Sequence, residues 1–363
     1  LPRHSIEEKV NLISKTLIVT LVVETKKYSF CVNKISQNCN YQFPNDTVRN
    51  ESLASGEYIP VNNIPFGIQI WRDKIFLTVP RWRLGVVSTL NFIWRNDTSQ
   101  SPLLIPYPNW ESTRKNSPNG IVNICRSRID ECNRLWGVDL GTEEVFGNTK
   151  IIKTGRLIAI DLTTDQIIRS YELEPPPQGQ RTFTANLEVD ADRSSCDNAY
   201  VYLTDIEQNT LTVYHYATND SWKFRHNYFH FNPLEGHYNM SGYDFQLTDG
   251  IMGLGLSNIQ KDGYKKLFFH PLSSGSEFVV STEIVRNKTM ATAPNYYAFK
   301  LLGWRGLKTN APTLRIDPAT EIAYYPLVLR NSIACWNTTT ILSPLTFRTY
   351  YYTIFFFIFV INP

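Results

Sequence analysis

Three histidines in one short stretch are the first candidates for metal chemistry. In HNYFHFNPLEGH, His226 and His230 are four residues apart and His237 follows. On a helix this spacing would bring two imidazole rings to one metal ion. The surrounding WKFRHNYFHF alternates between apolar and polar residues, which predicts a strand, and a strand separates His226 from His230 by about 13 Å. The pattern therefore disfavours a metal site, and we predict no metal ligands.

Two acids near predicted strand ends are candidate ligand-binding groups. Asp139 closes the run LWGVDL, and Asp249 precedes the glycine-rich GIMGLGLS. A metal-dependent hydrolase would need further acids at matching strand starts, but Ile64 and Pro65 precede FGIQIW. For each acid the structural alternative, a carboxylate that caps backbone amides, is favoured over a ligand role.

Nucleophilic and nucleotide chemistry have no sequence signature here. The chain contains no G-x-S-x-G elbow, and DGIMGLGLSN lacks both the G-x-G-x-x-G spacing and a following helix. The sequence therefore predicts no catalytic residue and no cofactor.

The elements that must position these residues repeat along the chain. Five segments each run from an extended stretch through a polar turn into an apolar second strand. The turns fall at Arg72–Asp73, Asp130–Asn133, Arg193–Asn198, Lys261–Gly263 and Asp317–Thr320. The second strands begin at Ile75, Leu135, Tyr200, Leu267 and Ile322, at intervals of 55 to 67 residues. Further strand-like sequence follows each hairpin, so the repeat predicts an all-β fold of the β-propeller type.

Composition favours a secreted protein. The net charge is +3 over 363 residues, which gives no indication of nucleic-acid binding. Seven Asn-x-Ser/Thr sequons favour glycosylation and an extracellular location. Their asparagines are Asn45, Asn50, Asn96, Asn219, Asn239, Asn287 and Asn337.

The six cysteines fit an oxidising compartment, because no C-x-x-C pair is present. Cys125 lies too far along its predicted strand from Cys132 for a disulfide. Cys132 and Cys196 occupy equivalent turns of consecutive units, and we predict that they form a bridge. Cys31 and Cys39 flank a short loop and form a second candidate pair, which leaves Cys125 and Cys335 without a predicted partner.

The ends of the chain differ from this pattern. We divide the sequence into an N-terminal segment at residues 1–40, the propeller domain at 41–345 and an apolar tail at 346–363. Thr16–Val23 is either a weak signal-peptide core or a strand. Thr349–Pro363 carries no charge, but its apolar run is shorter than the roughly 20 residues of a membrane span. We predict neither a membrane helix nor a blade there, but an aggregation-prone segment.

In ordered blocks from about residue 50 to 345, the sequence resembles the insect yellow / major royal jelly protein family. These blocks are ASGEYIP, FLTVPRWRLGVVSTLNFI, DECNRLWGVDLGT, LEGHYNMSGYDFQLTDGIMGLGLS, LFFHPLSSGSEFVVST and NSIACWNT. The resemblance implies a secreted, glycosylated, six-bladed propeller. Two departures are Trp136–Gly141, which reads WGVDLG where the family has W-V-x-D-T-G, and the end of the chain soon after ACWNT. We therefore expect about five recognisable blades, with the last incomplete.

Two functions are compatible with these features. The first is a non-enzymatic protein of cuticle pigmentation, or one that binds a small aromatic amine or a lipid-like ligand. The alternative, a dopachrome-converting enzyme of the melanin pathway, is implied by the resemblance alone. A pocket would lie at one mouth of the central channel. Its predicted residues are Asn91, Asp139 and Asp249, which are polar and near strand ends, with Phe183 as an aromatic wall.

Overall fold

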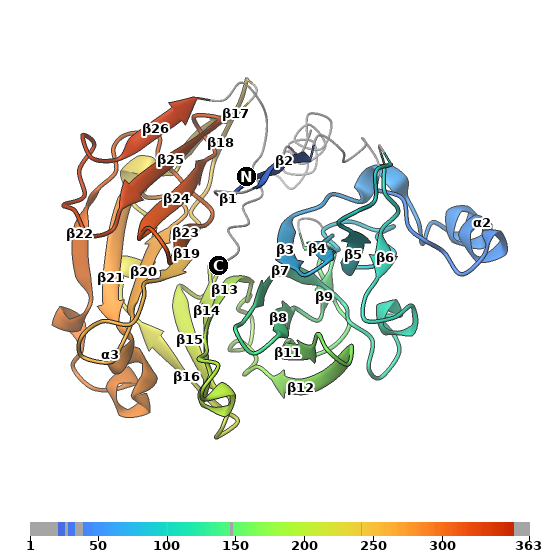
Figure 1. Cartoon of the computed structure of the whole chain (residues 1–363), viewed down its shortest axis with the longest axis horizontal. Coiled ribbons are helices and arrows are strands. Elements are labelled where there is room, and N and C mark those ends of the chain that lie inside the picture. Colours follow the sequence, from blue (N-terminus) through green and yellow to red (C-terminus); the bar gives the residue numbers. More distant parts are fainter. Residues whose placement is uncertain are drawn as a thin grey trace. The chain divides into compact units, whose positions relative to one another are not determined.

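The structure of the protein is a computed structural model that describes residues 21–25, 28–32, 39–99, 101–145, 148–240 and 242–351. The chain divides into two compact units, with the boundary between Pro175 and Pro176. Both are built mainly from antiparallel strands, and five four-stranded sheets are their principal elements (Figure 1).

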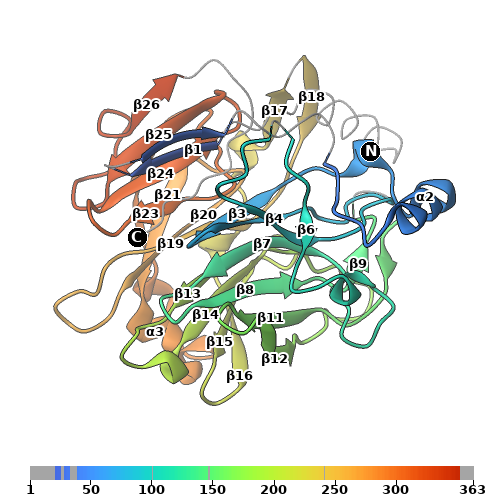
Figure 2. The same ribbon diagram turned by 45° about the vertical axis from the view of Figure 1, so that its right-hand side comes forward.

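Unit 1 contains two of these sheets. The first consists of β3 (Gly67–Trp71), β4 (Lys74–Thr78), β5 (Leu90–Trp94) and β6 (Ile105–Pro106). The second consists of β7 (Ile124–Ile129), β8 (Arg134–Asp139), β11 (Arg156–Asp161) and β12 (Gln166–Glu172), and Figure 2 shows its strands side by side. The smaller elements are hairpin β1 (Leu21–Thr25)–β2 (Tyr28–Val32), helix α2 (Asp46–Ser55) and hairpin β9 (Thr142–Glu143)–β10 (Lys150–Ile151).

Unit 2 contains the other three sheets. The first of them consists of β13 (Thr184–Asp190), β14 (Tyr200–Asp205), β15 (Thr210–His215) and β16 (Asp220–Arg225). The next consists of β19 (Ile251–Leu256), β20 (Lys266–Pro271), β21 (Ser276–Ser281) and β22 (Lys300–Trp304). The last consists of β23 (Arg315–Asp317), β24 (Ile322–Leu327), β25 (Ser332–Asn337) and β26 (Arg348–Tyr351). The smaller elements are hairpin β17 (His237–Met240)–β18 (Tyr243–Gln246) and helix α3 (Thr282–Arg286).

Each four-stranded sheet is an antiparallel meander in chain order, as in the blades of a β-propeller. First strands of neighbouring blades lie close together, β3 with β7 in unit 1 and β19 with both β13 and β23 in unit 2. The predicted all-β propeller with five recognisable blades is therefore confirmed. A sixth four-stranded sheet is not found among the described residues.

The hairpin repeat read from the sequence is confirmed nearly residue by residue. The five second strands begin within one residue of their predicted starts. Tight turns require left-handed backbone, which Arg72 (φ 53°), Asn133 (φ 58°) and Glu321 (φ 56°) supply. The alternation of side chains along a strand is a local property, so the sequence alone could locate these turns.

Asp130 organises the hairpin between β7 and β8. Its Oδ1 accepts hydrogen bonds from the backbone N–H groups of Cys132 (2.9 Å) and Arg134 (3.0 Å). Its Oδ2 accepts from Arg134 Nε and from the indole Nε1 of Trp136, both at 2.7 Å. The stretch IDECNRLW is thus held as a structural hairpin by one buried carboxylate.

Second-strand side chains join neighbouring blades by donating to backbone carbonyls. Thr78 Oγ1 donates to the carbonyl of Cys125 (2.5 Å), and Thr204 Oγ1 lies 3.4 Å from that of Met252. In the next blade His270 takes this position, with Nε2 3.0 Å from the carbonyl oxygen of Ala311. The three contacts satisfy carbonyl groups on segments that enter the next blade.

Two local predictions were wrong. The strand expected through His226–His230 ends at Arg225, and Asn227–Phe229 form a 3₁₀ turn. His226 caps this turn, because its Nδ1 accepts from Tyr228 N at 3.1 Å. Thr349–Tyr351, expected to lie outside any blade, pair as part of β26 with β25. Residues 352–363 of the predicted tail lie outside the described residues, as does Thr16–Thr20 of the predicted signal-peptide core.

The cysteines agree with the predicted hairpin register. Cys132 and Cys196 are both disulfide-bonded, as the predicted bridge requires. Cys125 lies in β7 with a free thiol, and Cys335 is also free. Cys39, a candidate partner of Cys31, is a free buried thiol whose pKa is raised by burial to about 12. That second candidate pair was therefore wrong.

Candidate functional site

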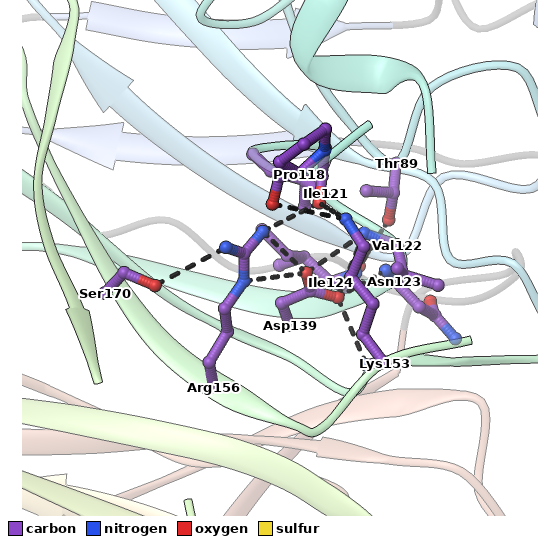
Figure 3. Close-up of polar contacts among 12 residues, drawn as sticks. Thr89, Pro118, Ile121, Val122, Asn123, Ile124, Asp139, Lys153, Arg156 and Ser170 are labelled. Atoms are coloured by element: carbon purple, nitrogen blue, oxygen red, sulfur yellow. Dashed lines mark hydrogen bonds and ion pairs between the residues drawn. The ribbon is translucent and has the colours of Figure 1, made fainter. Parts of the chain in front are cut away.

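The carboxylate of Asp139 at the end of β8 is surrounded by donors (Figure 3). Backbone N–H groups of Val122 (3.0 and 3.1 Å), Asn123 (2.8 Å) and Gly141 (3.2 Å) donate to it. Arg156 adds Nε and Nη2, each 3.3 Å from Oδ2. The Asp139 side chain is 1% exposed. These contacts are those of a carboxylate that fixes the loop leading into β7.

Two cations next to Asp139 also hold this loop. Arg156 Nη2 donates to the carbonyl of Gly120 at 2.7 Å, and Lys153 Nζ donates to the same carbonyl at 3.1 Å. Burial and the charge of Arg156 lower the pKa of Lys153. The charged groups in Figure 3 therefore form hydrogen bonds with the protein's own backbone.

Asp205, at the end of β14 in unit 2, likewise accepts hydrogen bonds from backbone N–H groups. Its Oδ1 accepts from the backbone N–H groups of Phe183 (3.2 Å), Glu207 (3.0 Å) and Gln208 (2.9 Å). Thr182 Oγ1 donates to Oδ2. Because both aspartates end a second strand and hold the segment before a first strand, we interpret their shared role as capping.

Asp249, two residues before β19, has a different environment. No hydrogen bond or ion pair to its carboxylate is found among the described residues. Burial and the neighbouring carboxylate of Glu207 raise its pKa to about 6. A partly buried acid with a perturbed pKa and no cationic partner is a candidate functional group.

The surroundings of Asp249 are rich in acceptors. The turn between β14 and β15 carries Glu207 and Asn209, and the Asn209 Oδ1 atom is buried without a hydrogen-bond partner in the described structure. Oδ1 is packed so tightly on Gly250 that a Cβ atom there would lie 1.8 Å from it. Phe183 borders the same turn, because its carbonyl accepts from Ile206 N at 3.1 Å. The Glu207 carboxylate lies 3.6 Å from Arg181 Nη2, whereas the Asp249 carboxylate and the Asn209 Oδ1 atom are acceptors without a described donor, which suits a cationic ligand better than an anion.

The four predicted ligand residues therefore have distinct positions. Phe183 and Asp249 border one turn in unit 2. Asp139 lies in unit 1 within its cage of donors. Asn91 is buried on β5, a third strand rather than a first one, where Nδ2 donates to the carbonyl of Ser88 at 3.0 Å. Asn91 Oδ1 has no hydrogen-bond partner among the described residues.

Sequence reasoning missed Glu207 and Asn209. Both stand in the sequence TDIEQNT, which reads as an ordinary polar turn. Only the fold brings that turn to the start of β19. Asn209 adopts φ 50°, a left-handed conformation common for asparagine in turns, so its type alone did not suggest a ligand role.

The five meander blades define a protein of the β-propeller class, and comparison with known proteins gives its family. The Major royal jelly protein (MRJP) family model matches residues 122–353. Protein yellow of Drosophila melanogaster is 38% identical over 333 residues, which are 91% of this chain and 61% of that protein. Protein yellow of Drosophila yakuba is 39% identical over 309 residues, 84% of this chain and 57% of the relative. The chain belongs to the yellow / major royal jelly protein family.

The chain spans about three fifths of the length of these curated relatives. Among solved structures, hydrazine synthase of Kuenenia stuttgartiensis is 12% identical, with a TM-score of 0.43 and coverage of 76% of this chain and 71% of that one. A likeness this weak assigns no activity. Within the described segments, none of the helices has the length and apolar character needed to cross a membrane.

Proposed function

We propose that this protein is a secreted, glycosylated member of the yellow family that serves insect pigmentation by binding a small aromatic amine, without catalysis. The ammonium group of the ligand would pair with Asp249, and its ring would contact Phe183. Family membership supports the link to pigmentation, and the acceptors around Asp249 support the ligand class.

The observation that carries this proposal is the uncompensated carboxylate of Asp249. An aspartate with a pKa of about 6 is mostly ionised at neutral pH, yet no described cation neutralises it. Glu207 pairs with the exposed Arg181 at 3.6 Å but still raises the pKa of Asp249, so binding a cation at Asp249 would relieve this repulsion as well as form an ion pair. A charged hydrogen bond of this kind contributes about 1.5–3 kcal/mol.

Exposure of the sequons supports secretion and glycosylation. All seven sequon asparagines are exposed, as an attached glycan requires. The disulfide-bonded state of Cys132 and Cys196 fits an oxidising compartment. Expression through a secretory pathway should give a protein whose mass falls on treatment with a peptide N-glycosidase. Unchanged mass would contradict the glycosylation.

Calorimetric titration with dopamine and serotonin tests the ligand proposal. We expect binding to the wild-type protein and a clear loss in Asp249→Asn, which removes the negative charge with little change in shape. Asp262→Asn is the matched control, because Asp262 is an exposed aspartate in the turn after the same strand, β19. Equal binding by Asp249→Asn and Asp262→Asn would overturn the assignment of Asp249.

The raised pKa of Asp249 favours one alternative function, conversion of dopachrome. A carboxyl group with a pKa of about 6 can accept and return a proton near neutral pH, as a general acid–base group must. Dopachrome decay followed by absorbance separates the two functions. Turnover that is lost in Asp249→Asn, without detectable amine binding, would favour the enzyme.

A further inference from the structure

Arg126 on β7 is a largely buried arginine without a counter-charge. Its guanidinium carbon lies 4.4 Å from the centre of the Phe66 ring, and its Nε is buried without a hydrogen-bond partner in the described structure. Burial and the positive charge of Arg128 lower the pKa of Arg126 to about 9. Among the described residues, the one neighbour that raises the pKa of Arg126 is the thiol of Cys125, which is a weak acid.

Other buried arginines in the described chain meet acceptors. The guanidinium of Arg81 donates to five backbone carbonyls, among them those of Val86 (2.9 Å) and Val87 (2.7 Å). Arg305 pairs with Glu277, and Arg134 pairs with Asp130 at 2.7 Å. These cations have visible structural roles. A buried cation without such acceptors is unfavourable, and a bound anion would remove that penalty.

The local fold places Arg126 beside the aromatic ring of Phe66, which packs against Trp82. The pairing of β7 with β8 shifts register between Ile124 and Ser127, a bulge that includes Arg126. Such bulges re-aim side chains. Gly67, next to Phe66, lets β3 approach closely, because a Cβ there would lie 3.3 Å from the Arg126 Cα. Phe66 is in turn supported edge-on by Trp82, with ring centroids 4.8 Å apart.

Arg128 extends the positive charge along the same strand. It lies two residues beyond Arg126 on β7, and its positive charge acts on the Arg126 guanidinium. Its Nη1 donates to the carbonyl of Ser127 at 3.2 Å. A planar guanidinium matches a carboxylate with two parallel hydrogen bonds, which a lysine could not provide.

We propose that Arg126, stacked on Phe66 and supported by the charge of Arg128, binds the carboxylate of a small aromatic acid. The ring of the ligand would contact the shelf formed by Phe66 and Trp82, and its carboxylate would lie against the Arg126 guanidinium. This site is independent of the proposed amine site, because it uses other residues, all in unit 1, and the opposite charge.

Titration with benzoate and benzamide tests this site, since the two molecules share shape and differ in charge. We expect the wild-type protein to bind benzoate and to bind benzamide at least about tenfold more weakly, as loss of a charged hydrogen-bonded pair implies. Arg126→Gln should lose the preference for benzoate, and Arg126→Lys should keep only part of it. Equal affinity of the wild-type protein for the two ligands would overturn the proposal.

Arg72→Gln is the matched control. The Arg72 guanidinium also lies 4.4 Å from an aromatic ring centre, that of Trp71, but Arg72 is exposed in the β3–β4 turn. We expect Arg72→Gln to bind benzoate like the wild-type protein. Loss of binding in both variants would show a non-specific charge effect and overturn the site.

Thermal unfolding separates binding from structural support. Without benzoate, Arg126→Gln should melt at the wild-type temperature or above it, because it removes an uncompensated cation. Benzoate should raise the melting temperature of the wild-type protein and leave that of Arg126→Gln unchanged. A variant that does not fold, or melts well below wild type, would identify Arg126 as a structural cation and overturn the proposal.

Discussion

Asp139 and Asp249 are the same residue type near strand ends in two different units, but their surroundings give them opposite properties. Asp139 meets three backbone amides and a guanidinium. Asp249 meets no described donor and has Glu207 as its charged neighbour. The contrast teaches that lying near a strand end does not by itself determine the role of an aspartate. What decides it is whether the loop before the first strand turns its N–H groups towards the carboxylate.

Because the blades repeat, Asp139 can also be compared with an equivalent residue in another blade. Asp205 occupies the position of Asp139 in another blade and is likewise saturated with donors. Asp249 instead precedes a first strand, β19. Carboxylates at the ends of second strands thus stabilise blades, whereas one at the start of a first strand remains open for another partner.

The largest expected effect that tests this comparison is the loss of stability on substitution of Asp139. Asp139→Ala removes the acceptor of three amides and leaves Arg156 without its carboxylate, in a place with almost no solvent. Breaking one partner of such a buried pair lowers the free energy of unfolding by about 3–5 kcal/mol. Denaturant unfolding followed by circular dichroism measures this change. A loss below about 1 kcal/mol, the usual effect of a point mutation, would contradict the capping role.

The next effect is on ligand binding at Asp249. Asp249→Asn should weaken dopamine binding by about tenfold to a hundredfold, the range that corresponds to a charged hydrogen bond of about 1.5–3 kcal/mol. Unlike Asp139→Ala, it should not lower stability, because no described donor loses its partner. Calorimetry and thermal unfolding of the same sample test both parts. A strongly destabilised Asp249→Asn would mean that Asp249 is also a structural acid.

The blades were predictable from the sequence, but the state of the two aspartates was not. Alternation within a strand and polar residues in a turn are local signals, and they located the second strands from Ile75 to Ile322. Two of the three backbone donors to Asp139 come from the loop ahead of β7, and the acid near Asp249 comes from the preceding blade. Whether a carboxylate is saturated depends on contacts between segments, which no local pattern reports.

The same limit explains the two local errors. WKFRHNYFHF alternates as a strand would, but the side chain of His226 bonds the backbone of Tyr228 and closes a turn instead. Conversely, Thr349–Tyr351 belong to an apolar run that lacks blade-like alternation, yet they complete a blade because β25 offers them an unpaired edge. Tertiary context overrode the local pattern in both places.

A change of pH should alter the ligand affinity of Asp249, which further tests how Asp249 differs from Asp139. Asp249 must be ionised to pair with an amine, and its pKa is about 6. Between pH 7 and pH 5 the ionised fraction falls about tenfold, so dopamine affinity should fall by about the same factor. Asp249→Asn should show no such dependence in this range. Titrations at several pH values test this, and a wild-type affinity that is constant from pH 7 to pH 5 would contradict an ion pair with Asp249.

The smallest expected effect is the contribution of Asp249 to stability as a function of pH. Burial raises its folded-state pKa from 3.8 to about 6, so between these values the folded protein holds a proton that the unfolded chain has released. The contribution of Asp249 therefore favours folding below pH 4 and is lost as pH rises to about 6. Two pKa units correspond to at most about 3 kcal/mol, and partial exposure to water reduces this to roughly 1 kcal/mol. The difference in unfolding free energy between the wild-type protein and Asp249→Asn, measured at pH 4 and pH 7, isolates this contribution, because the other titrating groups are shared. Relative to the variant, the wild-type protein should be less stable at pH 7 than at pH 4. A difference of the opposite sign would mean that a cation stabilises the Asp249 carboxylate in the free protein, and Asp249 would then be saturated like Asp139.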